Sequence, residues 1–166
     1  MIRGPTVEFD KLLAVLASLH ERGVEYVLIG AAALNVHNIV RATDDADIFL
    51  RPTVENVAKL RSALRAVFDD PEIEKITADD LLGEYPAVQY VSPTADFQLD
   101  ILTRVGEAFA YDDIHFEVVD VQGVPVRVAT PATLYRMKRD TVRPKDRLDA
   151  MMLREAFGLG DDDQER

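Results

Sequence analysis

The chain has 166 residues, of which 48% are apolar and 30% are charged, and its formal net charge is -11 at pH 7. This length suits one domain, and the apolar content excludes a globally disordered chain. We expect no broad, sequence-independent binding of nucleic acid, because an acidic surface repels phosphate backbones.

Three features that the sequence lacks bear on where in the cell the protein is expected. It contains no cysteine, which excludes disulfides and thiolate metal sites. No segment approaches the roughly 20 apolar residues of a membrane span, and the first ten residues, MIRGPTVEFD, have no apolar signal core. We therefore expect a cytoplasmic protein with no membrane contact.

The first third of the chain alternates helices with short strands. Apolar residues at helical spacing predict a helix over about 9–21. The segment 26–29 is too short and too rich in β-forming residues for a helix, so it predicts a buried strand. Gly30 follows at once and leads into a short helix from 31, and a second strand is predicted over 47–50.

The middle of the chain begins with a helix and continues as a group of strands. Thr53 is a suitable N-cap for a helix that continues to about Phe68. The polar segment 69–86 is predicted to be a loop with one short helix near Thr77. Four strands are then predicted, the last two as a hairpin around Gln122-Gly123: 87–91, 97–102, 116–121 and 124–128.

Two helices end the predicted fold. One begins at Pro131 and continues to about Lys138, and the other begins at Pro144 and stops near Gly158. We expect one domain over residues 1–160 and a disordered tail over 161–166. The element order predicts an α+β fold with helices packed on a mixed β-sheet, because the helices are too few for a doubly wound sheet.

The pattern Asp45-Ala46-Asp47-Ile48 places two carboxylates at the start of the second strand. Residues two apart in a strand project to the same side, so these carboxylates repel each other. Solvent, a shared proton or a hard cation relieves such repulsion, and Mg²⁺ prefers oxygen ligands. Taken alone, the pattern is more often a solvated strand start or a helix N-cap.

A third carboxylate, Asp100, lies within an apolar strand. Phe97, Leu99 and Ile101 share one face of that strand, and Asp100 belongs to the other. A carboxylate in such a strand is costly unless it is paired or ligates a metal. If this strand lies beside the strand of Asp47, three carboxylates converge, which suits a two-metal site for in-line phosphoryl transfer. The alternative is an ion pair between Asp100 and an arginine.

Other residues are candidates for contact with phosphate. Gly30 lies between a strand and a helix, where the backbone amides of the helix start favour phosphate. Arg41, which precedes the acidic pair together with Thr43, could donate two hydrogen bonds to a phosphate or pair with a neighbouring aspartate. For His37 we expect a hydrogen-bonded structural role rather than a ligand or base.

Basic residues gather in the last two helices and the segment between them. They are Arg136, Lys138, Arg139, Arg143, Lys145 and Arg147. In so acidic a chain this cluster is the best candidate for a triphosphate-binding patch, with Lys138 at the edge of the inner helix face. The alternative, which we weigh equally, is a solvated helix face paired with Asp140, Asp146 and Asp149.

Together these motifs resemble the signature of the minimal nucleotidyltransferase superfamily, which is DNA polymerase beta-like. The residues that carry the resemblance are Gly30-Ala31-Ala32-Ala33, His37, Arg41-Ala42-Thr43 and Asp45-Ala46-Asp47-Ile48. The chain is most similar to small prokaryotic branches, including abortive-infection and toxin-type members. A late lysine and a Lys-Asp-x-x-Asp element also recur there, and Lys138 and Lys145-Asp146-Arg147-Leu148-Asp149 resemble them.

The resemblance, which covers about 26–153, implies the nucleotidyltransferase fold and an enzyme. The implied reaction is the Mg²⁺-dependent transfer of a nucleoside monophosphate from an NTP to an acceptor hydroxyl on a small molecule, a protein or a tRNA end. Asp45, Asp47 and Asp100 would be catalytic and would hold one or two Mg²⁺ ions. The nucleotide would contact Gly30, Ala31, Arg41, Thr43, Lys138 and Lys145. Ala31 departs from the family, where many active members have serine or glycine.

Two other functions stay open at this point. Ala31 and the short chain also fit a non-catalytic member that binds a nucleotide or a small protein partner, for example in a toxin–antitoxin pair. The three carboxylates would serve a metal-dependent phosphohydrolase equally well. The turn at Gly30 and the Arg41-x-Thr43 approach favour nucleotide transfer over hydrolysis.

Overall fold

The computed structural model describes residues 9–39, 45–82, 87–94, 96–105, 109–139 and 144–159. Its helices are α1 (Phe9–Glu21), α2 (Gly30–Val36), α3 (Val54–Val67), α4 (Ala78–Leu82), α5 (Pro131–Arg139) and α6 (Pro144–Phe157), with 3₁₀ turns η1 (Pro71–Lys75) and η2 (Tyr111–Asp113). Its strands are β1 (Tyr26–Ile29), β2 (Ala46–Leu50), β3 (Ala87–Val91), β4 (Gln98–Leu102), β5 (Arg104–Val105), β6 (Phe109–Ala110), β7 (Phe116–Val121) and β8 (Val124–Ala129).

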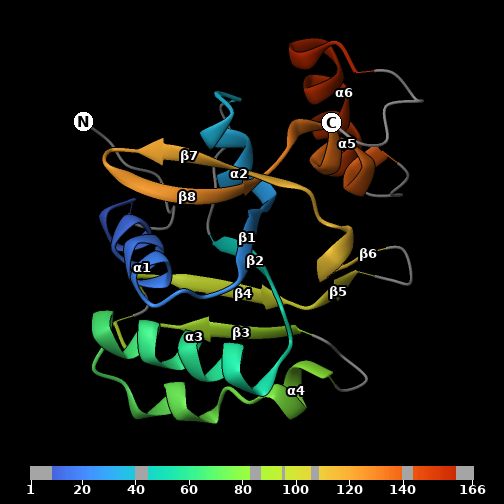
Figure 1. The fold of residues 1–166 in the computed structure, drawn as a ribbon. Coiled ribbons are helices and arrows are strands. Elements are labelled where there is room, and N and C mark those ends of the chain that lie inside the picture. The colour runs from blue at the N-terminus through green and yellow to red at the C-terminus, as the bar shows by residue number, and fades with distance from the viewer. Residues whose placement is uncertain are drawn as a thin grey trace.

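The longer strands form a mixed six-stranded sheet in the order β3-β4-β2-β1-β8-β7. The pairs β2–β4 and β1–β8 are parallel, and the pairs β3–β4, β1–β2 and β7–β8 are antiparallel. Figure 1 shows α1 and α3 together on one side of this sheet, with the α5–α6 pair set apart from them. This arrangement confirms the predicted α+β fold with helices packed on a mixed sheet.

The core fills the space between the sheet and the α1–α3 layer. Phe97 of the β4 approach stacks on Phe68 at the end of α3, with ring centroids 5.4 Å apart. The side chains of Leu99 and Ile101 are buried beside it, as the alternation in the sequence predicts. The apolar face of β4 therefore lies toward α3, and the face that carries Asp100 lies on the other side of the sheet.

The start of α3 is fixed by side-chain hydrogen bonds. Thr53 Oγ1 accepts from the backbone N–H of Asn56 at 3.1 Å, which confirms the predicted N-cap. The buried Asn56 amide in turn donates to the carbonyls of Glu25 and Arg51 and accepts from the N–H of Glu25. These bonds join α3 to the residues that flank β1 and β2.

A few elements differ from the predictions. The second strand begins at Ala46 rather than at residue 47, so Asp45 lies directly before it. The turn η1 lies in the polar segment that was predicted to be mainly a loop, and the β5–β6 hairpin, whose strands have two residues each, was not predicted. In the described part of the chain, no helix combines the length and the apolar character that a membrane crossing would require.

Candidate active site

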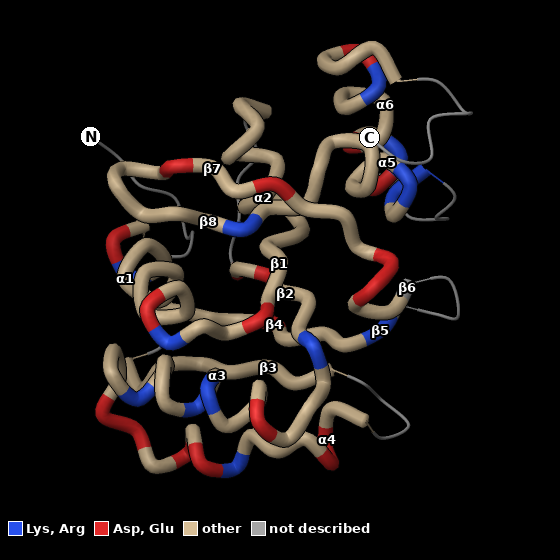
Figure 2. Tube along the Cα trace, in the orientation of Figure 1, with Lys and Arg blue, Asp and Glu red and all other residues tan. Residues whose placement is uncertain are grey.

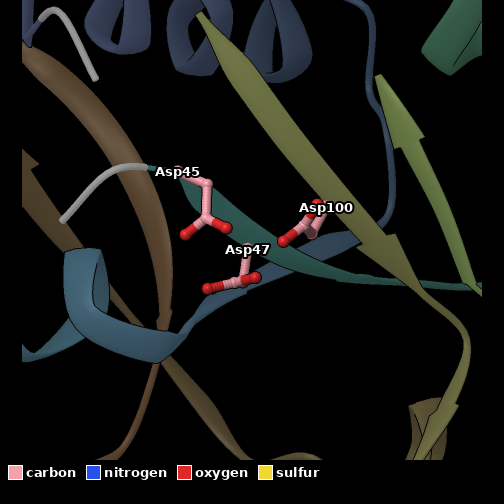
Figure 3. A group of neighbouring side chains, drawn as sticks. All are labelled: Asp45, Asp47 and Asp100. Atoms are coloured by element: carbon pink, nitrogen blue, oxygen red, sulfur yellow. The ribbon is translucent and has the colours of Figure 1, made fainter. Parts of the chain in front are cut away.

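Three carboxylates converge where the parallel strands β2 and β4 pair. The two strands pair in parallel with Asp47 directly opposite Asp100, and Asp45 immediately precedes β2. Each of the three offers a carboxylate oxygen, and these oxygens all lie within 4.8 Å of one another. Figure 3 shows the three side chains on the same side of the sheet, with Asp47 and Asp100 on adjacent strands. The strand of Asp100 therefore lies beside the strand of Asp47, and the three carboxylates converge as this arrangement required.

The electrostatics of this cluster favour a bound cation. Burial of the carboxyl and the neighbouring charges of Asp45 and Asp100 raise the pKa of Asp47 to about 7, while the charge of Lys138 acts in the opposite direction. Burial is the largest cause of this rise, and repulsion from the other two carboxylates adds to it. Closely spaced oxygen ligands with excess negative charge are the donor set that Mg²⁺ takes in proteins.

Gly30 is required at the turn between β1 and α2 for two reasons. Its backbone has a φ of +71°, a left-handed conformation that L side chains rarely adopt. A Cβ at this position would also lie 2.3 Å from Asp47 Oδ2. The glycine therefore leaves the space that the Asp47 carboxylate occupies, a function that the phosphate interpretation of the sequence did not include.

Two glutamines that the sequence analysis did not select hold the outer carboxylates. Gln98 Nε2 donates to Asp45 Oδ2 at 3.3 Å, and Gln89 Nε2 donates to Asp100 Oδ1 at 3.1 Å. Gln89 lies opposite Asp100 across β3 and β4. The signal for Gln98 was present in the sequence, because it lies two residues before Asp100 and so shares its strand face. Gln89 could be found only from the register of the sheet.

Lys138 is held by two aspartates of α6. Its Nζ lies 3.0 Å from Asp149 Oδ2 and 3.3 Å from Asp146 Oδ1. The three side chains are mostly buried, with exposed fractions of 14%, 1% and 12%, respectively. The alternative to a phosphate-binding patch was a solvated helix face in which basic residues pair with aspartates. Lys138 does pair with these two aspartates, but the three side chains are buried rather than solvated. The charge of Lys138 also lowers the pKa of Asp47, so this lysine acts on the carboxylate cluster as well as on α6.

The remaining predicted residues have different outcomes. Arg41, Thr43 and Asp140 lie outside the described residues, as does the tail 161–166. Lys145 belongs to α6, but its side chain also lies outside the described part of the structure. Ala31 lies in the first turn of α2, whose start has no capping side chain among the described residues.

His37 has the structural role expected for it. Its Nε2 donates to the carbonyl of Ala129 at 2.8 Å, and its ring meets the Phe157 ring edge-on at 5.8 Å. It therefore connects the end of α2 to the end of β8 and to α6.

Solved structures of nucleotidyltransferases share this fold. ANT(2")-Ia in complex with adenylyl-2"-tobramycin is 16% identical to the chain over 91% of each chain, with a TM-score of 0.56. The lincosamide antibiotic adenylyltransferase LnuA, bound to lincomycin, is 14% identical over 90% of this chain and 98% of that chain, with a TM-score of 0.56. An antigenic nucleotidyltransferase-like protein from Paracoccidioides brasiliensis is 14% identical over 95% of this chain and 81% of that chain, with a TM-score of 0.54.

These similarities establish the fold. No protein-family model and no curated protein matches the sequence. The chain has the nucleotidyltransferase fold, as its motifs implied, and its sequence identity to the solved structures is too low to carry more than the fold.

Proposed function

We propose that this chain is a Mg²⁺-dependent nucleotidyltransferase, which transfers a nucleoside monophosphate from an NTP to the hydroxyl group of an acceptor. The observation that carries the proposal is the convergence of Asp45, Asp47 and Asp100 on one side of a sheet that has the nucleotidyltransferase fold. Neither the fold nor the carboxylates alone would suffice, because acidic clusters and this fold each occur with other functions.

The three aspartates fit Mg²⁺ and would be its ligands. Their oxygens are close enough to share an ion, and a cation would relieve the repulsion that Asp45 and Asp100 exert on Asp47. The chemistry that bound Mg²⁺ supplies is neutralisation of the triphosphate and activation of the attacking hydroxyl. Gln98 and Gln89 would orient the outer two carboxylates, because each donates a hydrogen bond to one of them.

The nucleotide would lie between the carboxylates and the start of α2. Gly30 and the amides that follow it would contact its phosphates, since no side chain caps this helix start among the described residues. Ala31 would contribute only its backbone amide. Lys138, and also Arg41, Thr43 and Lys145, would balance or bind the triphosphate.

The reaction would be a displacement at the α-phosphorus. A bond forms between the acceptor oxygen and the α-phosphorus, and the bond from that phosphorus to the bridging oxygen of the β-phosphate breaks. Pyrophosphate leaves with this oxygen and its electron pair.

We assign Asp100 as the group that takes the acceptor proton, because its strand β4 lies beside the edge strand β3. Ala87, Gln89 and Val91 of β3 are exposed, so an acceptor can approach from that side.

The test is product formation with a nucleotide labelled on its α-phosphate. The purified protein is incubated with Mg²⁺, each of the four NTPs and pools of hydroxylated small molecules, proteins or tRNA. We expect a labelled acceptor and free pyrophosphate from the wild type and from Asp120→Asn, a control on exposed β7, and neither product from Asp47→Asn. Pyrophosphate or phosphate release without a labelled acceptor would instead identify a phosphohydrolase.

Ala31 supports a second candidate function. The hydroxyl that many active relatives have at this turn is absent, so the chain would bind a nucleotide without turning it over, or would need a small protein partner such as an antitoxin. Nucleotide binding without a labelled product, with the partner present, would support this candidate over the first. An Ala31→Ser variant that gains transfer activity would show that the missing hydroxyl is the cause.

A further inference from the structure

A groove on the outer surface of α3 has three arginines among its seven lining residues. It has a volume of about 680 Å³ and lies between the end of α1 and η1. Its lining includes the small residues Ala58, Ser62 and Ala66, which follow one another at one helical turn along α3. The other lining residues are Arg22, Arg61, Arg65 and one acidic residue, Glu74. The lining thus carries a formal charge of +2 in a chain whose net charge is -11.

Two of the three guanidinium groups are held by hydrogen bonds to neighbouring residues. Arg61 Nη1 donates to the Ile76 carbonyl at 2.7 Å, and its exposed fraction is 26%. Arg22 Nη1 donates to Ser18 Oγ at 3.2 Å and lies 3.8 Å from the exposed Glu21 carboxylate. Figure 2 shows these basic positions of α3 near acidic positions of the segment that follows it. An anion that enters this groove therefore meets oriented donors.

Glu74 already occupies the groove as an internal anion. Its Oε1 is bonded by Arg65 Nη1, and its Oε2 lies 3.9 Å from Arg61 Nε. More than half of the Glu74 side chain is exposed, so an external anion can displace it at little cost in burial. The Glu74 carboxylate interacts with two arginines. A phosphate has more oxygens and more negative charge, so it can interact with all three arginines.

The groove is separate from the three carboxylates of the candidate active site. Phe97 and Tyr90 of the sheet pack on Phe68 at the end of α3, whereas Asp47 and Asp100 lie on the opposite sheet face. The groove is on the outward surface of α3, so α3 and the sheet lie between the two sites. A ligand in the groove would not contact the nucleotide proposed above.

We propose that this groove is a binding site for a phosphate group, with Arg22, Arg61 and Arg65 as its donors and Glu74 as the internal carboxylate that the phosphate displaces. Arginine is suited to this role, because its planar fork gives two parallel hydrogen bonds to phosphate. The site does not depend on the proposed nucleotidyl transfer and can be tested without any nucleotide or metal.

The first experiment is a titration with inorganic phosphate in the presence of EDTA, followed by NMR of the arginine side-chain Nε–H groups. Without metal the acidic cluster repels phosphate, so the signal comes from other sites. We expect saturable shifts at Arg61 and Arg65 in the wild type. No saturable shift at these arginines would overturn the proposal.

Matched variants separate a built site from general charge attraction. Arg65→Gln should weaken phosphate binding by about fivefold or more, because it removes a charged donor. Lys75→Gln removes the same charge from the neighbouring η1, outside the lining, and should change binding less than about twofold. Equal losses in the two variants would overturn the proposal.

The glutamate gives the sharper comparison. Glu74→Gln should tighten phosphate binding, since it removes the competing charge, whereas Glu72→Gln removes a charge outside the lining and should not tighten it to the same extent. Weaker binding in Glu74→Gln would contradict the displacement that we propose.

The same titration with a short single-stranded RNA identifies the source of the phosphate. Tighter, Arg65-dependent binding of the RNA points to a nucleic-acid backbone, and its absence points to a small phosphorylated molecule.

Discussion

Gly30 and Gly23 have the same backbone conformation but different surroundings, which makes them a matched pair. Their φ angles are +71° and +66°, and only at Gly30 would a Cβ meet another atom, Asp47 Oδ2. Both alanine substitutions should lower the free energy of unfolding by about 1–2 kcal/mol, because of the left-handed backbone. Only Gly30→Ala should also lose Mg²⁺ and nucleotide binding, since its Cβ displaces Asp47. Calorimetric titration of the two variants checks this, and equal binding by both would contradict it.

Asp47 gives a prediction about pH. Its folded pKa of about 7 lies above its ordinary value of 3.8. Between these two pH values, the folded protein keeps a proton on Asp47 that the unfolded chain has released. This contribution to stability is complete below about pH 4 and is lost as the pH rises through about 7. In EDTA at pH 8, Asp47→Asn should therefore raise the free energy of unfolding, by about 1–4 kcal/mol.

The difference between Asp47→Asn and the wild type should shrink as the pH falls from 8 to 4, because Asp47 becomes protonated and then resembles asparagine. Urea denaturation at several pH values measures it. Asp120→Asn, on an exposed position of β7, serves as the control and should show no such trend. A stabilisation by Asp47→Asn that stayed constant over this range would contradict the assigned pKa.

Gln98 and Gln89 are expected to matter for metal affinity rather than for folding. Replacing either with alanine removes the amide that holds one outer carboxylate, so Mg²⁺ affinity should fall by about tenfold. Val91→Ala is a suitable control, because Val91 lies opposite Gln98 and has no amide. Metal titration followed by calorimetry compares them. A loss in Val91→Ala as large as in Gln98→Ala would show that packing, not the amide, is responsible.

The residues of the site were predictable to different degrees. Asp45 and Asp47 could be selected because residues two apart in a strand project to the same side, and Asp100 because a carboxylate in an apolar strand needs a partner. Their convergence could be stated only as a condition, since the sequence does not give the order of strands in a sheet. Gln89 and the contact between Gly30 and Asp47 depend on register and on φ, so neither has a signal in the local sequence.

The last two helices are joined by the buried ion pairs of Lys138, and this junction can be tested. Lys138→Met removes the ammonium group that lies 3.0 Å from the buried Asp149 carboxylate, so we expect the free energy of unfolding to fall by about 3 kcal/mol. The double variant Lys138→Met/Asp149→Leu should recover part of this loss, because no buried charge is left at position 149. Lys59→Met, on the exposed side of α3, is the control and should cost little. Urea denaturation gives all three values, and equal values for the two single variants would contradict a structural role of the pair.

Elements with a clear apolar pattern or a capping residue were predicted well, and the two-residue strands were not. The bounds of α1, β1 and α3 follow from apolar spacing, a strand-forming run and the Thr53 cap. By contrast, β5 and β6 have two residues each and pair only with each other. The basic cluster shows a further limit, because composition alone does not distinguish a phosphate-binding lysine from one paired to buried aspartates. Lys138 is paired in this way while its charge still acts on Asp47.

For the molecule as a whole, fold and activity rest on different observations. The chain shares the nucleotidyltransferase fold with solved structures that are 14–16% identical to it. The fold brings β2 beside β4 and places the β1–α2 turn against Asp47. The proposed activity depends on the charged side chains at that junction. A change that leaves the fold intact but neutralises these carboxylates is therefore expected to remove activity without unfolding the protein.

The most direct test of the proposed function is calorimetric titration of the protein with ATP, CTP, GTP and UTP, each with and without Mg²⁺. We expect one or more of these nucleotides to bind only when Mg²⁺ is present, and Asp45→Asn/Asp47→Asn to stay folded while losing that binding. Binding that persists unchanged in this double variant, or no binding of any of the four by the wild type, would contradict a nucleotide site at these carboxylates.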